Sequence, residues 1–224
     1  AFAALLVSWV SFFLAGIFLY KLIELDFSND IARSTLINLS VFPTSFFFLV
    51  AYSESLFLFL MLSTMYFVRK NSYIGIVTAY LCGATRITCV ALIAYLVVEA
   101  ICQIARKKSA VLLIITTVST VFGVGSYMMY LWFVKHDPLY FIAAHQKYWD
   151  RGQMTMPFKI LVSYVVHFKP QDFLAFRSNT IISLEFFLSL IFLALIIYGI
   201  KKLPISYTIY SIIVWSMPLS SGST

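Results

Sequence analysis

Charge is scarce in this sequence: of its 224 residues 11% are charged, whereas 62% are hydrophobic. Soluble globular domains carry about 25% charged residues, so the composition excludes an ordinary soluble domain. Several apolar stretches reach the roughly 20 residues that a helix needs to cross a bilayer. They lack the alternation of a membrane β-strand, and a backbone in lipid must satisfy its own hydrogen bonds. The sequence therefore predicts an all-α fold, a polytopic transmembrane helix bundle.

Motifs for soluble-enzyme chemistry are also missing. There is no P-loop, no GxSxG motif and no glycine-rich nucleotide motif, so kinase and soluble-hydrolase chemistry have no basis. The histidines (His136, His145 and His167) lack the spacing of metal ligands, and we expect no metal and no other cofactor. The cysteines are Cys82, Cys89 and Cys102. They lie in apolar stretches without CxxC spacing, which favours buried packing residues over metal or disulfide roles.

Neither end of the sequence resembles a natural terminus. The chain begins with Ala1 inside an apolar run, without an initiator methionine or a signal peptide, and it stops in the polar run 220–224. We therefore expect residues 1–224 to be an internal fragment that forms a single transmembrane domain, truncated at both ends.

Two apolar stretches, residues 36–68 and 73–104, are too long for one comfortable crossing. Tyr52-Ser53-Glu54 and Pro43 interrupt the first, and Thr85-Arg86 interrupts the second. Each stretch could be one tilted helix with a buried charge, or two short helices folded as a hairpin. Only the hairpins place every basic cluster on one face, the cytosolic one, as the loop-charge rule requires. These clusters are Lys21, Arg69-Lys70, Arg106-Lys107-Lys108 and Lys201-Lys202. The net charge of +7 thus indicates membrane topology and no nucleic-acid partner.

The remaining segments complete the predicted topology. A first span over residues 1–20 is followed by a polar connection, residues 21–34, and residues 110–134 form an uncharged span that rises to the outer face. Residues 135–178 are too rich in charged and aromatic side chains to cross, so they predict an outer loop with short interfacial helices. Residues 180–200 cross back, and residues 205–219 begin another crossing.

Glu54 and Arg86 are charges in the middle of otherwise apolar stretches. An ionisable group at membrane depth costs several kcal/mol unless it is paired or faces water, so both are candidate functional residues. The hairpins place both on the outer face, near enough to share one polar cavity, and Tyr52 and Ser53 next to Glu54 are candidate substrate-binding residues. An equally good interpretation is that they pair only to hold the bundle together.

The outer segment 144–151 combines aromatic rings, hydrogen-bond donors and a fixed cation. Gln146 and Trp149 suit a sugar, because an aromatic ring stacks on a pyranose face, and Arg151 can form two hydrogen bonds to a phosphate group. Taken alone, the same residues are more typical of an interfacial aromatic belt with snorkelling cations.

The order of motifs resembles the PIG-V type of GPI mannosyltransferase and its prokaryotic relatives. FPTSFFF and YSESLF, within residues 42–70, are similar to the Phe-Pro-x-Ser-x-Phe and Tyr-Ser-Glu-x-Leu-Phe pattern of that family. Gly83 to Arg86 resembles its Leu-x-Arg region, and Gln146 to Arg151 with Pro157 resembles its Gln-x-x-Trp-x-Arg segment. Ser220-Ser221 stands where a Ser-x-x-Arg-Tyr motif would come next.

The resemblance implies a GT-C fold and an activity. Such an enzyme transfers a sugar, typically mannose, from a dolichyl- or polyprenyl-phosphate donor to a glycolipid or other lipid-linked acceptor at the non-cytosolic face. Arg86 and Arg151 would then bind the donor phosphate, while Gln146 and Trp149 line the sugar or acceptor pocket. The catalytic Asp of the family is expected in a first outer loop that this sequence lacks, which leaves Glu54 as a supporting group or as the base itself.

Other functions fit the same pattern. A transporter or flippase also uses broken helices with a charge near the membrane midplane, but it usually shows internal repeats and a polar path to both faces. A structural subunit would use the outer loop as an assembly surface. Partners are membrane lipids in every case, and the membrane is the endoplasmic reticulum in a eukaryote or the plasma membrane in a prokaryote.

Overall fold

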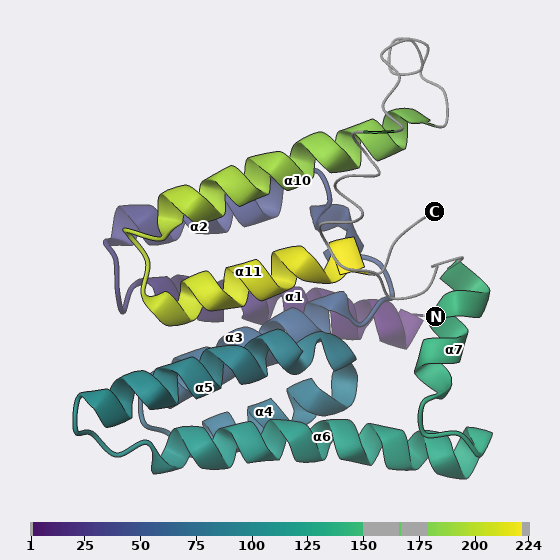
Figure 1. Ribbon diagram of the computed structural model, residues 1–224, viewed down its shortest axis with the longest axis horizontal. Coiled ribbons are helices and arrows are strands. Elements are labelled where there is room, and N and C mark those ends of the chain that lie inside the picture. Colours follow the sequence, from purple (N-terminus) through teal and green to yellow (C-terminus); the bar gives the residue numbers. More distant parts are fainter. Residues whose placement is uncertain (1, 150–165, 167–178, 221–224) are drawn as a thin grey trace. The chain divides into compact units, whose positions relative to one another are not determined.

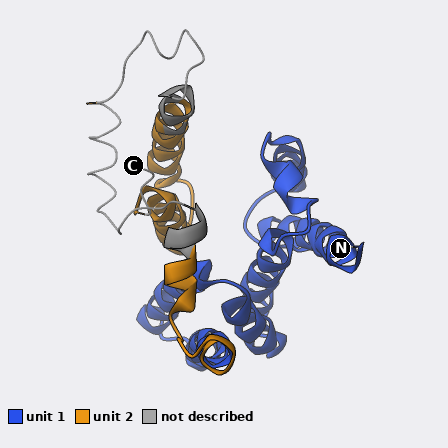
Figure 2. Cartoon of the chain, turned by 90° about the vertical axis from the view of Figure 1, so that its right-hand side faces the viewer, with its two compact units in different colours: residues 1–130 blue, residues 131–224 orange. Residues whose placement is uncertain are grey.

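The computed structural model describes residues 2–149, 166 and 179–220, and all regular secondary structure in this part of the chain is helical (Figure 1). The all-α prediction is therefore confirmed for the described residues. The chain divides into two compact units, residues 1–130 and residues 131–224 (Figure 2). A single transmembrane domain over residues 1–224 stays a prediction.

Among the described residues, three helices are long and apolar enough to cross a membrane. They are α1 (Phe2–Ile23), α6 (Val111–Lys135) and the segment Ile87–Ala105, in which η2 (Ile87–Cys89) continues into α5 (Val90–Ala105). At 1.5 Å per residue the 22 residues of α1 extend about 33 Å, which matches a hydrocarbon core of roughly 30 Å. Large apolar side chains on these helices point outward, such as Phe13 at 69% and Phe122 at 67% exposure. These surfaces suit lipid, and they support a membrane protein.

Both long apolar stretches are broken where the sequence predicts. The first forms α2 (Asn29–Val41), η1 (Ser45–Phe48) and α3 (Glu54–Arg69), and the second forms α4 (Ile74–Thr85) before η2 and α5. Phe42 has φ −60° and ψ 135°, the extended conformation that a following proline favours. Arg86 is also extended, with φ −152° and ψ 142°, which ends α4. The chain reverses direction within each stretch, between α2 and α3 and between α4 and α5, so hairpins and not long tilted helices are present (Figure 1).

The predicted polar connection over residues 21–34 is wrong in its extent. Helix α1 continues to Ile23 and α2 begins at Asn29, so the connection is only a few residues long. Ser28 has the extended backbone of an N-cap, and Asp30 lies in the first turn of α2, where the helix dipole favours an acidic side chain. These polar residues therefore begin a helix, whereas the sequence predicted a connecting segment.

The connections α1–α2, α3–α4 and α5–α6 lie at the same end of unit 1, which we call the basic end (Figure 1). The cations at this end are Lys21, Arg69, Lys70, Arg106, Lys107 and Lys108. The breaks before α3 and after α4 lie at the opposite end. The predicted clustering of basic residues on one side is thus confirmed within unit 1. This confirmation does not extend to the lysines of the α10–α11 turn, which belong to unit 2.

Helices α4 and α6 run in the same direction and approach closely through small residues (Figure 1). A Cβ atom added to Gly83 would lie 2.2 Å from the backbone oxygen of Thr120, and one added to Gly123 would lie 2.1 Å from that of Tyr80. Two hydrogen bonds join the same helices: Ser119 Oγ donates to Ile76 O at 2.9 Å, and Tyr80 Oη and Ser126 Oγ are 2.7 Å apart. Such small-residue contacts are typical of helices that associate in lipid, where apolar burial gives no driving force.

An ion pair fastens the α1–α2 connection to the end of α3. Arg69 donates to Asp26 from Nη1 to Oδ2 at 2.9 Å and from Nη2 to Oδ1 at 2.5 Å. The two side chains are 22% and 17% exposed, respectively. This bidentate geometry is the strong form of an arginine–carboxylate pair, and it holds the basic end of α1 against α3.

Asp26→Asn is expected to lower the free energy of unfolding by about 1 kcal/mol. The change removes the charge but keeps the shape, and the pair is neither fully exposed nor fully buried. Thermal unfolding of the purified protein in detergent measures the loss. Glu24→Gln is the matched control, because Glu24 is exposed and makes no ion pair with a described residue. Equal losses in the two variants would show that the Asp26–Arg69 pair does not stabilise the fold.

Unit 2 contains α7 (Tyr140–Trp149), α10 (Asn179–Gly199) and α11 (Ile205–Ser220). Helices α10 and α11 form a hairpin that is fastened by a hydrogen bond of 2.9 Å from Trp215 Nε1 to Ser189 O. Lys201 and Lys202 lie in its turn, as predicted from the spans on either side. Helix α7 falls within the predicted outer loop 135–178, most of which lies outside the described residues. An interfacial position for α7 stays a prediction.

Candidate functional site

Glu54 and Arg86 are placed by the two helix breaks at the end of unit 1 opposite the basic end. Glu54 is the first residue of α3, so the helix dipole there favours its negative charge. Arg86 directly follows the last residue of α4, where the dipole favours a positive charge. Arg86 is also the N-cap residue of η2, which continues into α5 and whose dipole opposes a positive charge, so only Glu54 lies at a helix end that suits its sign alone.

The two side chains form an ion pair. Arg86 Nη1 and Glu54 Oε1 are 2.5 Å apart, and the side chains are 32% and 35% exposed. The sequence predicted that these charges can lie close together, and the structure confirms the proximity. The ion pair alone does not distinguish a structural role from a role in binding a ligand. The polar atoms of Glu54 and Arg86 that the pair does not use help to distinguish them.

Both partners keep hydrogen-bonding capacity. Glu54 Oε2 is buried and has no hydrogen-bond partner among the described residues. Arg86 uses one of its guanidinium nitrogens in the ion pair, and a guanidinium has five N–H donors. A buried oxygen without a hydrogen-bond partner costs about 1–3 kcal/mol, and more when it is charged. The site therefore contains more polar atoms than an ion pair with a purely structural role requires. Chemically, the arrangement can present an anion-binding cation beside a carboxylate that can accept a proton.

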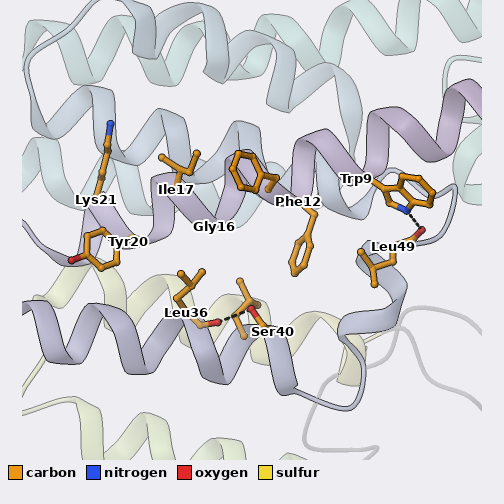
Figure 3. Close-up of a pocket in the computed structure, with 11 residues that line it drawn as sticks. Trp9, Phe12, Gly16, Ile17, Tyr20, Lys21, Leu36, Ser40 and Leu49 are labelled. Atoms are coloured by element: carbon orange, nitrogen blue, oxygen red, sulfur yellow. Dashed lines mark hydrogen bonds between the residues drawn. The ribbon is translucent and has the colours of Figure 1, made fainter.

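The segment of residues 42–53 leads into Glu54 and is hydrogen-bonded to α1 at two points. Ser8 Oγ donates to Tyr52 O at 3.2 Å, and Trp9 Nε1 donates to Leu49 O at 2.9 Å (Figure 3). The polar atoms of α1 thus satisfy backbone oxygens that lie about 40 residues further along the chain. Sequence reasoning missed Ser8 and Trp9, because nothing in an apolar helix indicates which distant carbonyl its polar atoms will reach.

Tyr52 and Ser53, predicted to belong to the site, precede Glu54 in this loop. Tyr52 is 53% exposed, and its ring stacks on that of Phe47 with the centroids 6.4 Å apart. Ser53 is the N-cap residue of α3, but its side chain makes no capping hydrogen bond. Both lie next to the ion pair in sequence, and neither forms a hydrogen bond with Arg86 in the described part of the chain. Their part in binding stays a prediction.

The other predicted site residues belong to unit 2 or lie outside the described residues. Gln146 and Trp149 belong to α7 in unit 2, and only their backbone is described. Arg151 lies outside the described residues. Their roles toward a sugar or a phosphate stay predictions. Within the described part of the chain, no group of three or more His, Cys, Asp or Glu side chains could hold a metal ion.

Comparison of the chain with protein-family models, with curated proteins and with solved structures finds no match. No family is therefore shown for it. What the protein does has to be inferred from the motif order and from the chemistry of Glu54 and Arg86.

Proposed function

We propose that the protein is a multi-pass membrane glycosyltransferase of the GT-C type. It transfers mannose from a polyprenyl- or dolichyl-phosphate donor to a lipid-linked acceptor at the non-cytosolic face. The observation that carries the proposal is the Glu54–Arg86 pair, formed by two helix breaks in an otherwise apolar unit and left with unused polar atoms. The order of motifs around both residues, which resembles that of PIG-V type mannosyltransferases, supports it.

On this proposal Arg86 binds the phosphate of the donor. A guanidinium can hold two phosphate oxygens at once while one nitrogen stays with Glu54, and the leaving phosphate needs such stabilisation as the glycosidic bond breaks. Glu54 keeps Arg86 oriented, and its second oxygen can accept a proton. Arg151 would add a second phosphate contact, and Trp149 with Gln146 would line the sugar or acceptor pocket.

The position of the pair agrees with the proposed side of the membrane. The basic end of unit 1 faces the cytosol under the positive-inside rule, so the opposite end, with Glu54 and Arg86, faces the endoplasmic reticulum lumen or the bacterial exterior. The membrane is then the endoplasmic reticulum in a eukaryote and the plasma membrane in a prokaryote.

A transporter or flippase is the second candidate, because one observation also favours it. Arg86 interrupts a helical hairpin with extended backbone, and transporter sites are often built from such discontinuous helices. The placement of Glu54 and Arg86 at one end of unit 1, rather than along a path between both ends, favours the transferase.

The test is a transfer assay on the full-length protein in membranes. Radiolabelled mannose is supplied as a polyprenyl-phosphate donor, and transfer to the lipid fraction is measured for wild type, Arg86→Ala, Arg86→Lys and Arg151→Ala. Arg86→Ala is expected to reduce turnover at least 100-fold, or by roughly 2.7 kcal/mol in the barrier. Arg86→Lys should restore only part of it, because an ammonium cannot bind bidentately.

Arg33→Ala is the matched control, since Arg33 is exposed on α2 and forms no ion pair with a described residue. It should leave transfer unchanged. Full activity of Arg86→Ala would remove Arg86 from the site. Absence of transfer from any lipid-linked sugar, with the protein folded, would favour the transporter.

A further inference from the structure

A groove runs along α1 on the side that faces α2 (Figure 3). It encloses about 480 Å³. Its lining begins at Trp9 and Leu49 and ends at Tyr20 and Lys21, at the basic end. Twelve residues of helix separate Trp9 from Lys21, so the groove follows α1 for about 18 Å. This length is close to the roughly 15 Å of hydrocarbon in one leaflet of a bilayer.

The wall of the groove presents hydrocarbon. Most lining side chains are apolar, among them Phe12, Ile17 and Leu36. The polar atoms along the wall are already bonded within the protein: Ser40 Oγ donates to Leu36 O at 2.9 Å, and Trp9 Nε1 donates to Leu49 O (Figure 3). A polar ligand would therefore have no hydrogen-bond partner along most of the groove, whereas an alkyl chain needs none.

The end at Lys21 differs from the rest. Lys21 is exposed and forms no ion pair with a described residue, and the Tyr20 ring lies beside it at the same end (Figure 3). Glu24 follows one turn later without pairing with Lys21. A lysine at a helix end reaches along an apolar surface to place its ammonium at the headgroup level. In the described part of the chain, an apolar groove that ends at an exposed lysine without an ion pair matches an alkyl chain attached to a phosphate.

We propose that the groove between α1 and α2 binds one acyl chain of a phospholipid from the leaflet at the basic end, with the lipid phosphate at the Lys21 ammonium. The proposal rests on α1 lying in the membrane and not on the transfer activity. It places the phosphate of a lipid at the opposite end of unit 1 from the Glu54–Arg86 pair.

Photo-crosslinking in nanodiscs tests the proposal. The full-length protein is labelled with phosphatidylethanolamine that carries a photoreactive acyl chain, or with diacylglycerol that carries the same chain, and labelled residues are mapped by mass spectrometry. Phosphatidylethanolamine is expected to label Phe12 and Leu36 at least fivefold more than diacylglycerol does. Val10, which is exposed on α1 and does not line the groove, reports on contact with bulk lipid.

Ser40→Leu fills the groove and should reduce labelling of Phe12 and Leu36 at least fivefold. Thr35→Leu is its matched control, because Thr35 makes the same kind of hydrogen bond on α2, to Ile31 O, without lining the groove. Lys21→Gln should abolish the preference for phosphatidylethanolamine, whereas Lys70→Gln at the same end should not.

Four results would overturn the proposal. The first three are equal labelling by the two probes in the wild type, labelling that Ser40→Leu does not reduce, and labelling of Val10 without labelling of the groove, which would indicate that another segment of protein fills it. Failure of every probe to label Val10 would show that α1 is not in lipid, and it too would overturn the proposal. Each result is independent of whether mannose transfer is detected.

Discussion

Gly123→Ala is expected to destabilise the protein by about 3 kcal/mol, the upper part of the range for overpacking. The new methyl group would lie 2.1 Å from the backbone oxygen of Tyr80 and 2.9 Å from the backbone nitrogen of Ala84. Backbone atoms inside a helix cannot rotate away as a side chain can, so α4 and α6 would have to separate. The separation would also weaken the hydrogen bond between Tyr80 and Ser126.

Gly125→Ala is the matched control on the same helix. No atom lies within 4 Å of a Cβ added at Gly125, and alanine forms helix better than glycine by about 1 kcal/mol. Thermal unfolding in detergent should therefore show a lower midpoint for Gly123→Ala and an unchanged or slightly higher one for Gly125→Ala. If Gly123→Ala unfolds at the wild-type temperature, α4 and α6 do not touch at this position.

Reversal of one charge in the Glu54–Arg86 pair is the second large effect. Arg86→Glu would place two carboxylates side by side and is expected to cost about 2 kcal/mol of stability. This is less than the 3–5 kcal/mol for breaking a buried pair, because both side chains are about a third exposed. The double variant Glu54→Arg with Arg86→Glu restores the attraction and should recover part of the loss. Recovery is partial, because the arginine at position 54 then opposes the dipole at the N-terminus of α3.

The double variant separates a structural pair from a functional one. If the pair only holds the bundle together, the swap restores both the unfolding midpoint and mannose transfer. On the proposed function, the swap restores the midpoint but not the transfer, because the phosphate-binding cation has moved from position 86 to position 54. Unfolding and transfer are measured on the same preparation, so a loss of folded protein cannot be mistaken for a loss of activity.

Helix positions could be predicted from the sequence because composition and helix breakers determine them locally. Pro43 forces its neighbour out of helical geometry, and long apolar runs mark α1 and α6, whose observed ends lie within three residues of the prediction. The start of α2 was missed, since Asn29 and Asp30 are polar and favour a loop and a helix start equally. Polarity alone does not distinguish those two outcomes.

Contacts between helices were less predictable. Nothing local indicates that α4 packs beside α6 and not only beside its neighbours in sequence: Gly75 lies against Val68 of α3, whereas Gly83 lies against Thr120 of α6. For the site, the rarity of charge at membrane depth identified Glu54 and Arg86, and topology placed them at one end. The bonds from Ser8 and Trp9 that hold the loop before Glu54 are contacts between distant segments, which single-sequence patterns do not encode.

The shortness of α4 has a consequence for how the protein is made. Its 12 residues extend about 18 Å, too little to cross a bilayer core of roughly 30 Å without help. Helix α6, which packs tightly against α4, begins 26 positions after α4 ends, and α5 lies between them in the sequence. Helix α3 is already available to pack against α4, but the contacts of α4 with α6 can form only after α5 has been synthesised. The order of synthesis, and not hydrophobicity alone, then decides when this part of the protein becomes a finished membrane structure.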